Sequence, residues 1–163
     1  MITFHGLDVT AEQLLHESET LYGQLLPRLL RPMPGLEEWI GLLIDSGLPF
    51  ALTTSSRRRW VDMILADQPW RERLAFILSG DDVKHGKPHP EMYLTAAKKF
   101  DVEAHTMLVV EDSGNGCAAG VAAGALVAAV PSEHTQDQDF SGARLVADSL
   151  TDPKLGRLLQ TAG

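Results

Sequence analysis

The sequence predicts an α/β fold in which helices cover both faces of a parallel, doubly wound sheet. Short apolar runs without polar alternation recur along the chain, which is typical of strands buried on both faces. Helical patterns separate these runs at the spacing of strand–helix–strand units. Polar residues follow several of the runs. Right-handed crossovers would gather these strand ends at one edge of the sheet, where such sheets bind ligands.

The first third of the chain is expected to form two helices and one strand. Thr10 and Gln13 have the spacing of a capping box, and leucines recur at helical spacing until Pro27 interrupts the pattern. After a proline-rich connection, a second amphipathic helix is expected to end at Gly47. The unalternating apolar run over residues 49–54 predicts the first strand.

The remainder of the chain alternates helices and strands. Ser55 or Ser56 is expected to cap the next helix, over residues 57–67. Apolar runs predict further strands over residues 76–79, 106–110, 125–130 and 145–147. Helical patterns predict further helices starting near residue 90, over residues 117–123 and over residues 153–159.

The composition is that of one soluble globular domain with room for a small appendage. The formal net charge of −8, without a basic stripe, argues against general binding to nucleic acid or to an anionic membrane. Cys117 is the only cysteine, so the sequence allows no internal disulfide and implies no oxidising compartment. No apolar stretch is long enough to span a bilayer, and the N-terminus has no signal-peptide pattern, so we expect a cytoplasmic protein.

Two adjacent carboxylates, Glu111 and Asp112, directly follow an apolar run. At a strand end such a pair repels itself unless a cation or solvent relieves the repulsion. Magnesium prefers carboxylate oxygens and retained waters, so one acid could bind the ion directly and the other through water. The alternative is two solvated acids near the N-terminus of the next helix, where negative charge is favourable.

Hydroxyls and one lysine predict a phosphate site. The stretch from Thr53 to Ser56 ends a strand and opens a helix, where hydroxyls and free backbone N–H groups suit an anion; simple helix capping would need only one of these residues. Lys87 stands between Gly86 and Pro88, which restrict the backbone and could aim the ammonium at a phosphate. An ordinary surface lysine is the alternative interpretation.

Three further patterns are less specific. Arginines at positions 57–59 fill the first turn of a helix, where a nearby phosphate would relieve the unfavourable positive charge and where solvation is the alternative. His85 and His89 have a metal-binding spacing for a helix, but the neighbouring prolines predict a loop. The glycines after Asp112 fit G-x-G-x-x-A, and Glu133 lies near the position of a ribose-binding acid. A dinucleotide-binding domain is therefore a weaker alternative. The carboxylates before the glycines disfavour a pyrophosphate at this position.

Taken together, the hydroxyls of residues 53–56, Lys87 and the Glu111–Asp112 pair resemble motifs II, III and IV of the haloacid dehalogenase-like hydrolases, in the same order. The stretches that carry the resemblance are GLPFALTTSS, GDDVKHGKPHPEMYLTAAKKF and VVEDSGNGCAAGVAAGA, and the similarity extends from about residue 3 to residue 151. It is greatest to the subfamily with a helical cap, which includes phosphoglycolate phosphatases, beta-phosphoglucomutase and pseudouridine-phosphate phosphatases. The resemblance implies a Rossmann-like three-layer core, a magnesium cofactor, and hydrolysis or transfer of the phosphoryl group of a small sugar- or acid-phosphate.

The resemblance also implies roles for individual residues. Thr54 would bond the phosphoryl group with help from Ser55, and Lys87 would stabilise the phosphate and the charge of the nucleophile. Asp112 would bind magnesium, with Glu111 beside it through water. These roles agree with phosphoryl transfer as a reaction that depends mainly on positioning and charge neutralisation.

One expected motif is missing from the sequence. The family begins with a strand that ends in D-x-D, whose first aspartate is the nucleophile; here only Asp8 is a candidate, and its surroundings predict a loop. We therefore expect residues 1–31 to be the remnant of an incomplete helical cap and residues 32–163 to be a core without the motif I strand. The chain would then be an inactive phosphatase through truncation or a misplaced start, or a non-catalytic phosphate-binding or interaction module. Its sheet must close the resulting gap or borrow a strand, so oligomerisation is a further expectation.

Overall fold

A computed structural model describes residues 9–161, which divide after Pro32 into two compact units. The first unit contains one helix, α2 (Ala11–Leu29). Its N-terminus has the expected capping box: Thr10 Oγ1 accepts the Gln13 N–H at 3.1 Å, and the Gln13 side chain accepts the Thr10 N–H at 2.8 Å. The helix ends two residues beyond Pro27, since a proline near a helix end removes little of the hydrogen-bond ladder.

The second unit, from Met33 onward, alternates helices with short strands. Its strands are β1 (Leu52–Thr53), β2 (Ile77–Leu78), β3 (Leu108–Glu111), β4 (Leu126–Ala129) and β5 (Leu145–Val146). Its helices are α3 (Leu36–Ser46), α4 (Arg58–Ile64), α5 (Glu91–Phe100), α6 (Gly114–Ala122) and α7 (Pro153–Thr161), with short 3₁₀ turns η1 (Arg71–Arg73), η2 (Gly80–Asp82) and η3 (Ala104–Thr106). Every strand and helix that the sequence predicts in this unit is present. No helix in the described range is both long and apolar enough to cross a membrane.

All strand pairs are parallel, which confirms the predicted α/β fold, but the strands form two separate pieces. β1 pairs with β2, and β3, β4 and β5 pair in that order. Within residues 9–161, neither β1 nor β3 has a partner on its other edge. The expected gap between these two strands is therefore neither closed nor filled by a borrowed strand in the described part of the chain.

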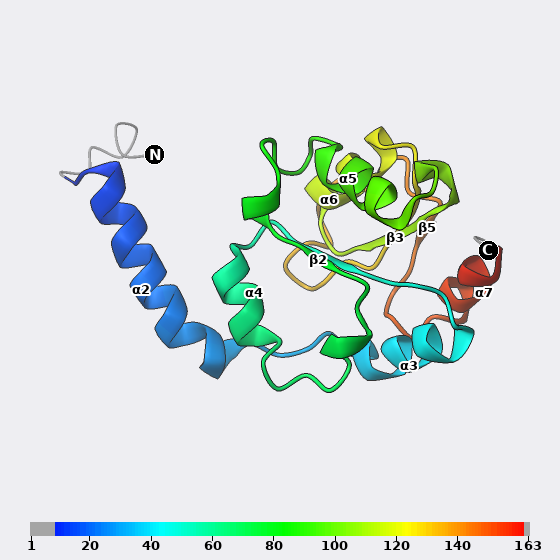
Figure 1. The fold of residues 1–163 in the computed structure, drawn as a ribbon, viewed down its shortest axis with the longest axis horizontal. Coiled ribbons are helices and arrows are strands. Elements are labelled where there is room, and N and C mark those ends of the chain that lie inside the picture. The colour runs from blue at the N-terminus through cyan, green and yellow to red at the C-terminus, as the bar shows by residue number, and fades with distance from the viewer. Residues whose placement is uncertain (1–8, 162–163) are drawn as a thin grey trace. The chain divides into compact units, whose positions relative to one another are not determined.

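Helices cover both faces of the sheet (Figure 1). α5 and α6 lie on one side, where buried side chains such as Tyr93, Cys117 and Val127 pack together. α3 and α7 lie on the other side, where Trp39 and Leu155 pack against β4 and β5. The arrangement is the three-layer core that the sequence predicts.

The N-terminus of α4 differs from the expectation. Neither Ser55 nor Ser56 caps it: the residue before the helix is Arg57, whose side chain makes no capping bond. Instead the Asp81 carboxylate, from η2, accepts the Arg58 N–H at 2.9 Å. The Ser56 carbonyl accepts the Gly80 N–H at 2.8 Å, so Ser56 contacts η2 and not the N-terminus of α4. A carboxylate at this helix N-terminus also offsets the positive charge of the first-turn arginines.

Candidate functional site

A cavity of about 890 Å³ in the second unit separates β1 from β3. The residues before and within the two strands line two of its sides, and side chains of α3 and α5, among them Trp39 and Phe100, line the others. Most of this lining is apolar. All five residues that the sequence singles out lie on this cavity: Thr54, Ser55, Lys87, Glu111 and Asp112.

The cavity is large enough to hold a short segment of extended chain. At about 3.3 Å of rise per residue, about 4.8 Å between strands and about 10 Å between packed layers, a strand residue fills roughly 160 Å³. A cavity of about 890 Å³ can therefore hold several residues of extended chain. Because β1 and β3 each have an unpaired edge in the described structure, the cavity has the walls that an additional strand requires.

The hydroxyl side of the cavity follows β1. The Thr54 N–H donates to the Leu78 carbonyl at 2.9 Å, so this backbone donor belongs to the strand pairing and is not free for an anion. The Thr54 hydroxyl accepts the Ser56 N–H at 3.1 Å and keeps its own proton for a ligand. Ser55 is exposed. A Cβ on Gly80 would come within 2.5 Å of the Ser55 carbonyl oxygen, so glycine is required for this close contact between two loops.

The acidic side of the cavity contains a buried ion pair. Lys87 Nζ donates to Glu111 Oε1, and their side chains are only 7% and 6% exposed. The Tyr93 hydroxyl donates to the same carboxylate oxygen, and Lys87 Nζ lies 5.1 Å from the centre of the Tyr93 ring. Lys87 Nζ also lies 3.5 Å from the Thr53 carbonyl oxygen, so this lysine contacts both β1 and β3. Lys87 is thus held by a pre-formed buried cluster.

Burial and the neighbouring Glu111 carboxylate raise the pKa of the Tyr93 phenol well above its ordinary range. The hydroxyl therefore remains protonated and continues to donate to Glu111. The Ser113 hydroxyl donates to the other Glu111 oxygen at 3.3 Å. With both oxygens bonded, the Glu111 carboxylate is fixed in position.

Gly116 makes room for this carboxylate. A Cβ at Gly116, in the first turn of α6, would lie 1.7 Å from Glu111 Oε2. The Ser113 hydroxyl caps the same helix by accepting the Gly116 N–H at 3.1 Å. The close approach that a dinucleotide-binding glycine would offer to a pyrophosphate is occupied here by a carboxylate, which disfavours the dinucleotide alternative.

Asp112 differs from its neighbour. Its side chain is exposed and lines the cavity directly beyond the end of β3. Among the described residues, Glu111 and Asp112 are the only acids that line this cavity. Asp8, the one sequence candidate for a nucleophile, lies outside the described residues.

The loop that carries Lys87 is held at its ends by Glu91. The two carboxylate oxygens of Glu91 accept the backbone N–H groups of Lys84, at 2.8 Å, and of His85, at 3.0 Å. These bonds lower the pKa of Glu91, the Lys84 N–H contributing most, so the carboxylate is ionised at neutral pH.

Sequence reasoning missed three residues of the site: Tyr93, Gly116 and Glu91. The apolar pattern of α5 places Tyr93 in the core but says nothing about where its hydroxyl points. A glutamate at the first position of α5 has the signature of helix capping, and a glycine in a small-residue helix has that of close packing. Only contacts across the fold reveal their roles.

Comparison with known proteins places the chain in one family. The model of the haloacid dehalogenase-like hydrolase family matches residues 5–130. The bifunctional riboflavin kinase/FMN phosphatase of Arabidopsis thaliana is 36% identical over 127 residues, which are 77% of this chain and 34% of that protein. The plasmid-encoded CbbY of Cupriavidus necator is 34% identical over 123 residues, which are 74% of this chain and 48% of that protein. The chain thus spans half or less of the length of these relatives.

Solved structures give the same result. CbbY from Rhodobacter sphaeroides, in complex with phosphate, matches with a TM-score of 0.68 and 29% identity, over 74% of this chain and 55% of that one. A family IA hydrolase from Entamoeba histolytica matches with a TM-score of 0.82 over 99% of this chain and 76% of that one. At 23% identity the second match shows the fold alone.

Proposed function

Because this chain belongs to the haloacid dehalogenase-like hydrolases, we propose that its cavity is the active site of a phosphatase that hydrolyses the monoester of a small sugar- or acid-phosphate. The observation that carries the proposal is the meeting of Thr54, Lys87 and Asp112 on one cavity at the carboxyl ends of β1 and β3. This combination offers a hydroxyl donor, an ammonium and an ionised oxygen ligand. These are the groups that phosphoryl transfer requires for positioning and charge neutralisation.

We assign the phosphoryl oxygens to Thr54 and Lys87. The Thr54 hydroxyl donates one hydrogen bond, and the exposed Ser55 can add a second. Lys87 has three N–H donors, of which Glu111 accepts one and the Thr53 carbonyl a second, long one. Glu111 therefore orients the ammonium and leaves it a donor for the substrate.

A magnesium ion fits the donor set beside β3. Asp112 offers an exposed carboxylate, which is the ligand that Mg²⁺ prefers, and would hold the ion directly. Glu111, buried against Lys87 and Tyr93, would act on it only through water or through its charge. When bound, the ion supplies neutralisation of phosphoryl charge.

We propose that the nucleophile belongs to a strand that occupies the cavity between β1 and β3. Such a strand would run parallel to both neighbours, bury apolar side chains on both faces and end level with Thr54 and Asp112. An aspartate directly after it would attack phosphorus and form an aspartyl-phosphate, as the family resemblance implies, while the bond to the ester oxygen breaks and the substrate leaves as an alcohol with a proton from the second aspartate. Water would then hydrolyse the aspartyl-phosphate to inorganic phosphate and the free aspartate. Residues 1–31 would then be the remnant of the family's helical cap.

Hydrolysis of p-nitrophenyl phosphate in the presence of magnesium tests the proposal in two steps. The chain of 163 residues alone is expected to show little or no turnover, because we assign the nucleophile to the additional strand. Adding a synthetic peptide with six apolar residues followed by Asp-x-Asp-Gly-Thr is expected to bring turnover above the background. The matched control peptide has asparagine in place of the first aspartate. Turnover by the printed chain alone that is lost in Asp112→Asn would contradict the assignment of the nucleophile.

A non-catalytic role is the second candidate, because the acids that line the cavity among the described residues are the ion-paired Glu111 and the proposed metal ligand Asp112. It predicts that the chain binds inorganic phosphate in a Lys87-dependent manner and that neither peptide brings turnover. Phosphate binding is measured by calorimetry with the wild-type chain and Lys87→Met. Turnover with the aspartate peptide decides for the phosphatase.

A further inference from the structure

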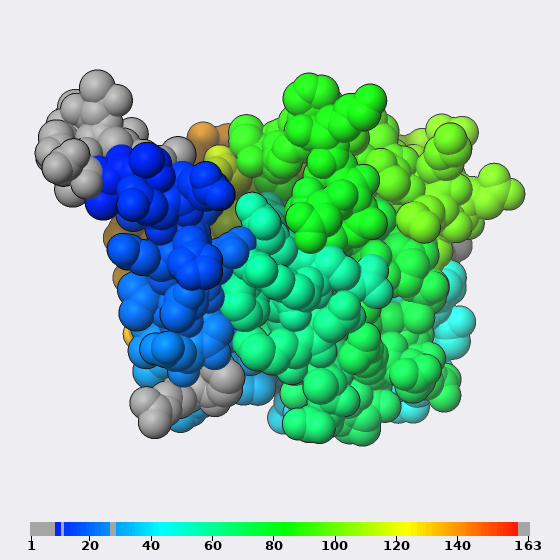
Figure 2. Space-filling view, turned by 60° about the vertical axis from the view of Figure 1, so that its left-hand side comes forward, coloured from blue at the N-terminus to red at the C-terminus, as the bar shows by residue number. Residues whose placement is uncertain are grey.

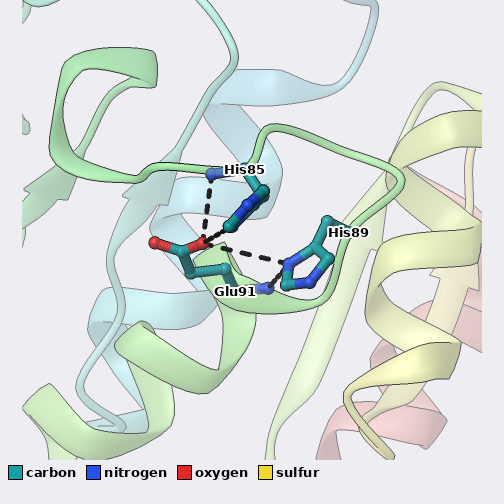
Figure 3. Close-up of side chains that lie close together, drawn as sticks. All are labelled: His85, His89 and Glu91. Atoms are coloured by element: carbon teal, nitrogen blue, oxygen red, sulfur yellow. Dashed lines mark hydrogen bonds and ion pairs between the residues drawn. The ribbon is translucent and has the colours of Figure 1, made fainter.

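A cluster of possible metal ligands lies outside the cavity, on the loop that carries Lys87. His85 and His89 project from this loop, and Glu91 begins α5 behind it (Figure 3). We propose that these three side chains form a second metal site, selective for Zn²⁺ or a similar transition metal ion. The sequence spacing suggested only the two histidines. The contacts of Glu91 with both of them are seen in the structure.

The geometry of the cluster is close to that of a tetrahedral site. Glu91 Oε2 lies 2.8 Å from His85 Nδ1 and 3.9 Å from His89 Nδ1. Bonds of about 2.0–2.1 Å to tetrahedral zinc set ligand atoms about 3.3 Å apart. All three ligand atoms lie within 4.8 Å of one another, so rotations of the two exposed histidine rings would be needed to bring them to one ion. The fourth position would be left to water.

The Glu91 carboxylate is already held in place by the loop. Its two oxygens already accept backbone N–H groups, and each retains a lone pair for a metal. His89 Nδ1 accepts the Glu91 N–H at 3.3 Å, and a metal ion would replace this hydrogen bond. His85 Nδ1 lies 2.8 Å from Glu91 Oε2, and a metal ion would likewise replace this hydrogen bond.

The chemistry of the donors separates this site from the proposed magnesium site. Two imidazoles and one carboxylate suit zinc, whereas magnesium prefers oxygen donors and retained waters. The loop is also accessible, since the His85 and His89 side chains are 65% and 52% exposed. The loop with His85 and His89 belongs to the bright green atoms at the top of Figure 2.

Zinc binding would act directly on the loop of Lys87. This lysine lies between the two histidines in the sequence, and an ion joining His85, His89 and Glu91 would cross-link the loop to the start of α5. The site is independent of catalysis, so its test needs no turnover and stands whatever the outcome for the phosphatase.

Calorimetric titration of the intact chain with Zn²⁺ at about pH 7.5 tests the proposal. We expect one saturable site, weakened about tenfold or more by His85→Ala and by His89→Ala, since even the loss of outer partners of a metal ligand has effects of this size. His105→Ala removes another exposed histidine, in η3, and is expected to leave the affinity unchanged. Co²⁺ in place of Zn²⁺ should give the visible absorption of a tetrahedral complex, lost in His89→Ala.

Asp112→Asn distinguishes the two metal sites and is expected to retain Zn²⁺ binding. The proposal is overturned by the lack of saturable binding, by His89→Ala binding like the wild type, or by a loss in Asp112→Asn or His105→Ala. Both histidines are exposed, so their replacement leaves the fold intact, which circular dichroism can verify.

Discussion

Apolar packing stabilises each of the two pieces of the sheet, β1–β2 and β3–β4–β5. The described contacts between the two pieces at the site are polar. Leu78 of β2 packs with Met92 and Ala96 of α5, and Val127 of β4 packs with Tyr93 and Cys117. Between the pieces, Lys87 contacts the Thr53 carbonyl on one side and the Glu111 carboxylate on the other. At the site the contact between the pieces therefore depends on charged groups, although Leu36 and Leu43 of α3 and side chains of α5 pack against both pieces.

The sharpest way to break this junction is Glu111→Gln, which leaves the buried Lys87 ammonium without its counter-charge. Removing one partner of a buried ion pair costs about 3–5 kcal/mol, and we expect a loss of that order in urea unfolding. Asp112→Asn, one residue away but exposed, should stay within about 0.5 kcal/mol. Equal effects of the two variants would show that the ion pair does not hold the junction.

A second test of the same pair starts from the destabilised variant. Adding Lys87→Met to Glu111→Gln removes the unpaired charge, so part of the lost stability should return. Additive losses in the double variant would mean that Lys87 and Glu111 act separately.

Gly116→Ala attacks the junction from α6, because the new Cβ would overlap the Glu111 carboxylate. We expect a loss of about 1–3 kcal/mol in thermal or urea unfolding, typical of overpacking in a core. Gly41→Ala is the matched control: it also lies within a helix, α3, but a Cβ there meets nothing within 4 Å. The control should be stabilising by up to about 1 kcal/mol, since alanine favours helix. A Gly116→Ala variant as stable as the control would refute the packing of Glu111 against this glycine.

High pH should weaken the junction through Tyr93. The folded state holds this phenol protonated above its ordinary pKa, so the stability it contributes is present below about pH 10 and falls as the pH rises further. The slope is at most about 1.4 kcal/mol per pH unit, because the unfolded chain releases one proton that the folded chain retains. Unfolding free energies of the wild type and Tyr93→Phe between about pH 9 and pH 11 measure it. The same slope in Tyr93→Phe would assign the effect to another group.

The smallest expected effect concerns the β1–β2 piece alone. Asp81→Ala removes the carboxylate that caps α4 through the Arg58 N–H, and loss of an N-cap costs about 1 kcal/mol. Asp67 is exposed and serves as the control: Asp67→Ala should change the free energy of unfolding much less. Because Asp81 lies away from the ion pair, its effect should add to that of Glu111→Gln; strong coupling between them would join the two regions that we treat as separate.

The sequence predicts the elements of the fold well because each depends on local patterns. No knowledge of tertiary contacts is needed to predict the capping box at Thr10, the helix stop at Gly47 or the apolar run that ends at Glu111. The gathering of Thr54, Lys87 and Asp112 could also be predicted, because parallel strands bring their carboxyl ends to one edge. The cap of α4 was predicted wrongly, because a carboxylate from another loop replaced the nearby serines.

What the sequence determined by itself is therefore the order of helices and strands, the shared edge of the sheet and the family. Periodicity and chain direction are sufficient for these. Only the tertiary structure decided that Glu111 is buried against Lys87, Tyr93 and Gly116 while Asp112 remains exposed, and that Glu91 joins two histidines. Two adjacent carboxylates look alike along the chain; burial and partners from distant segments make them different.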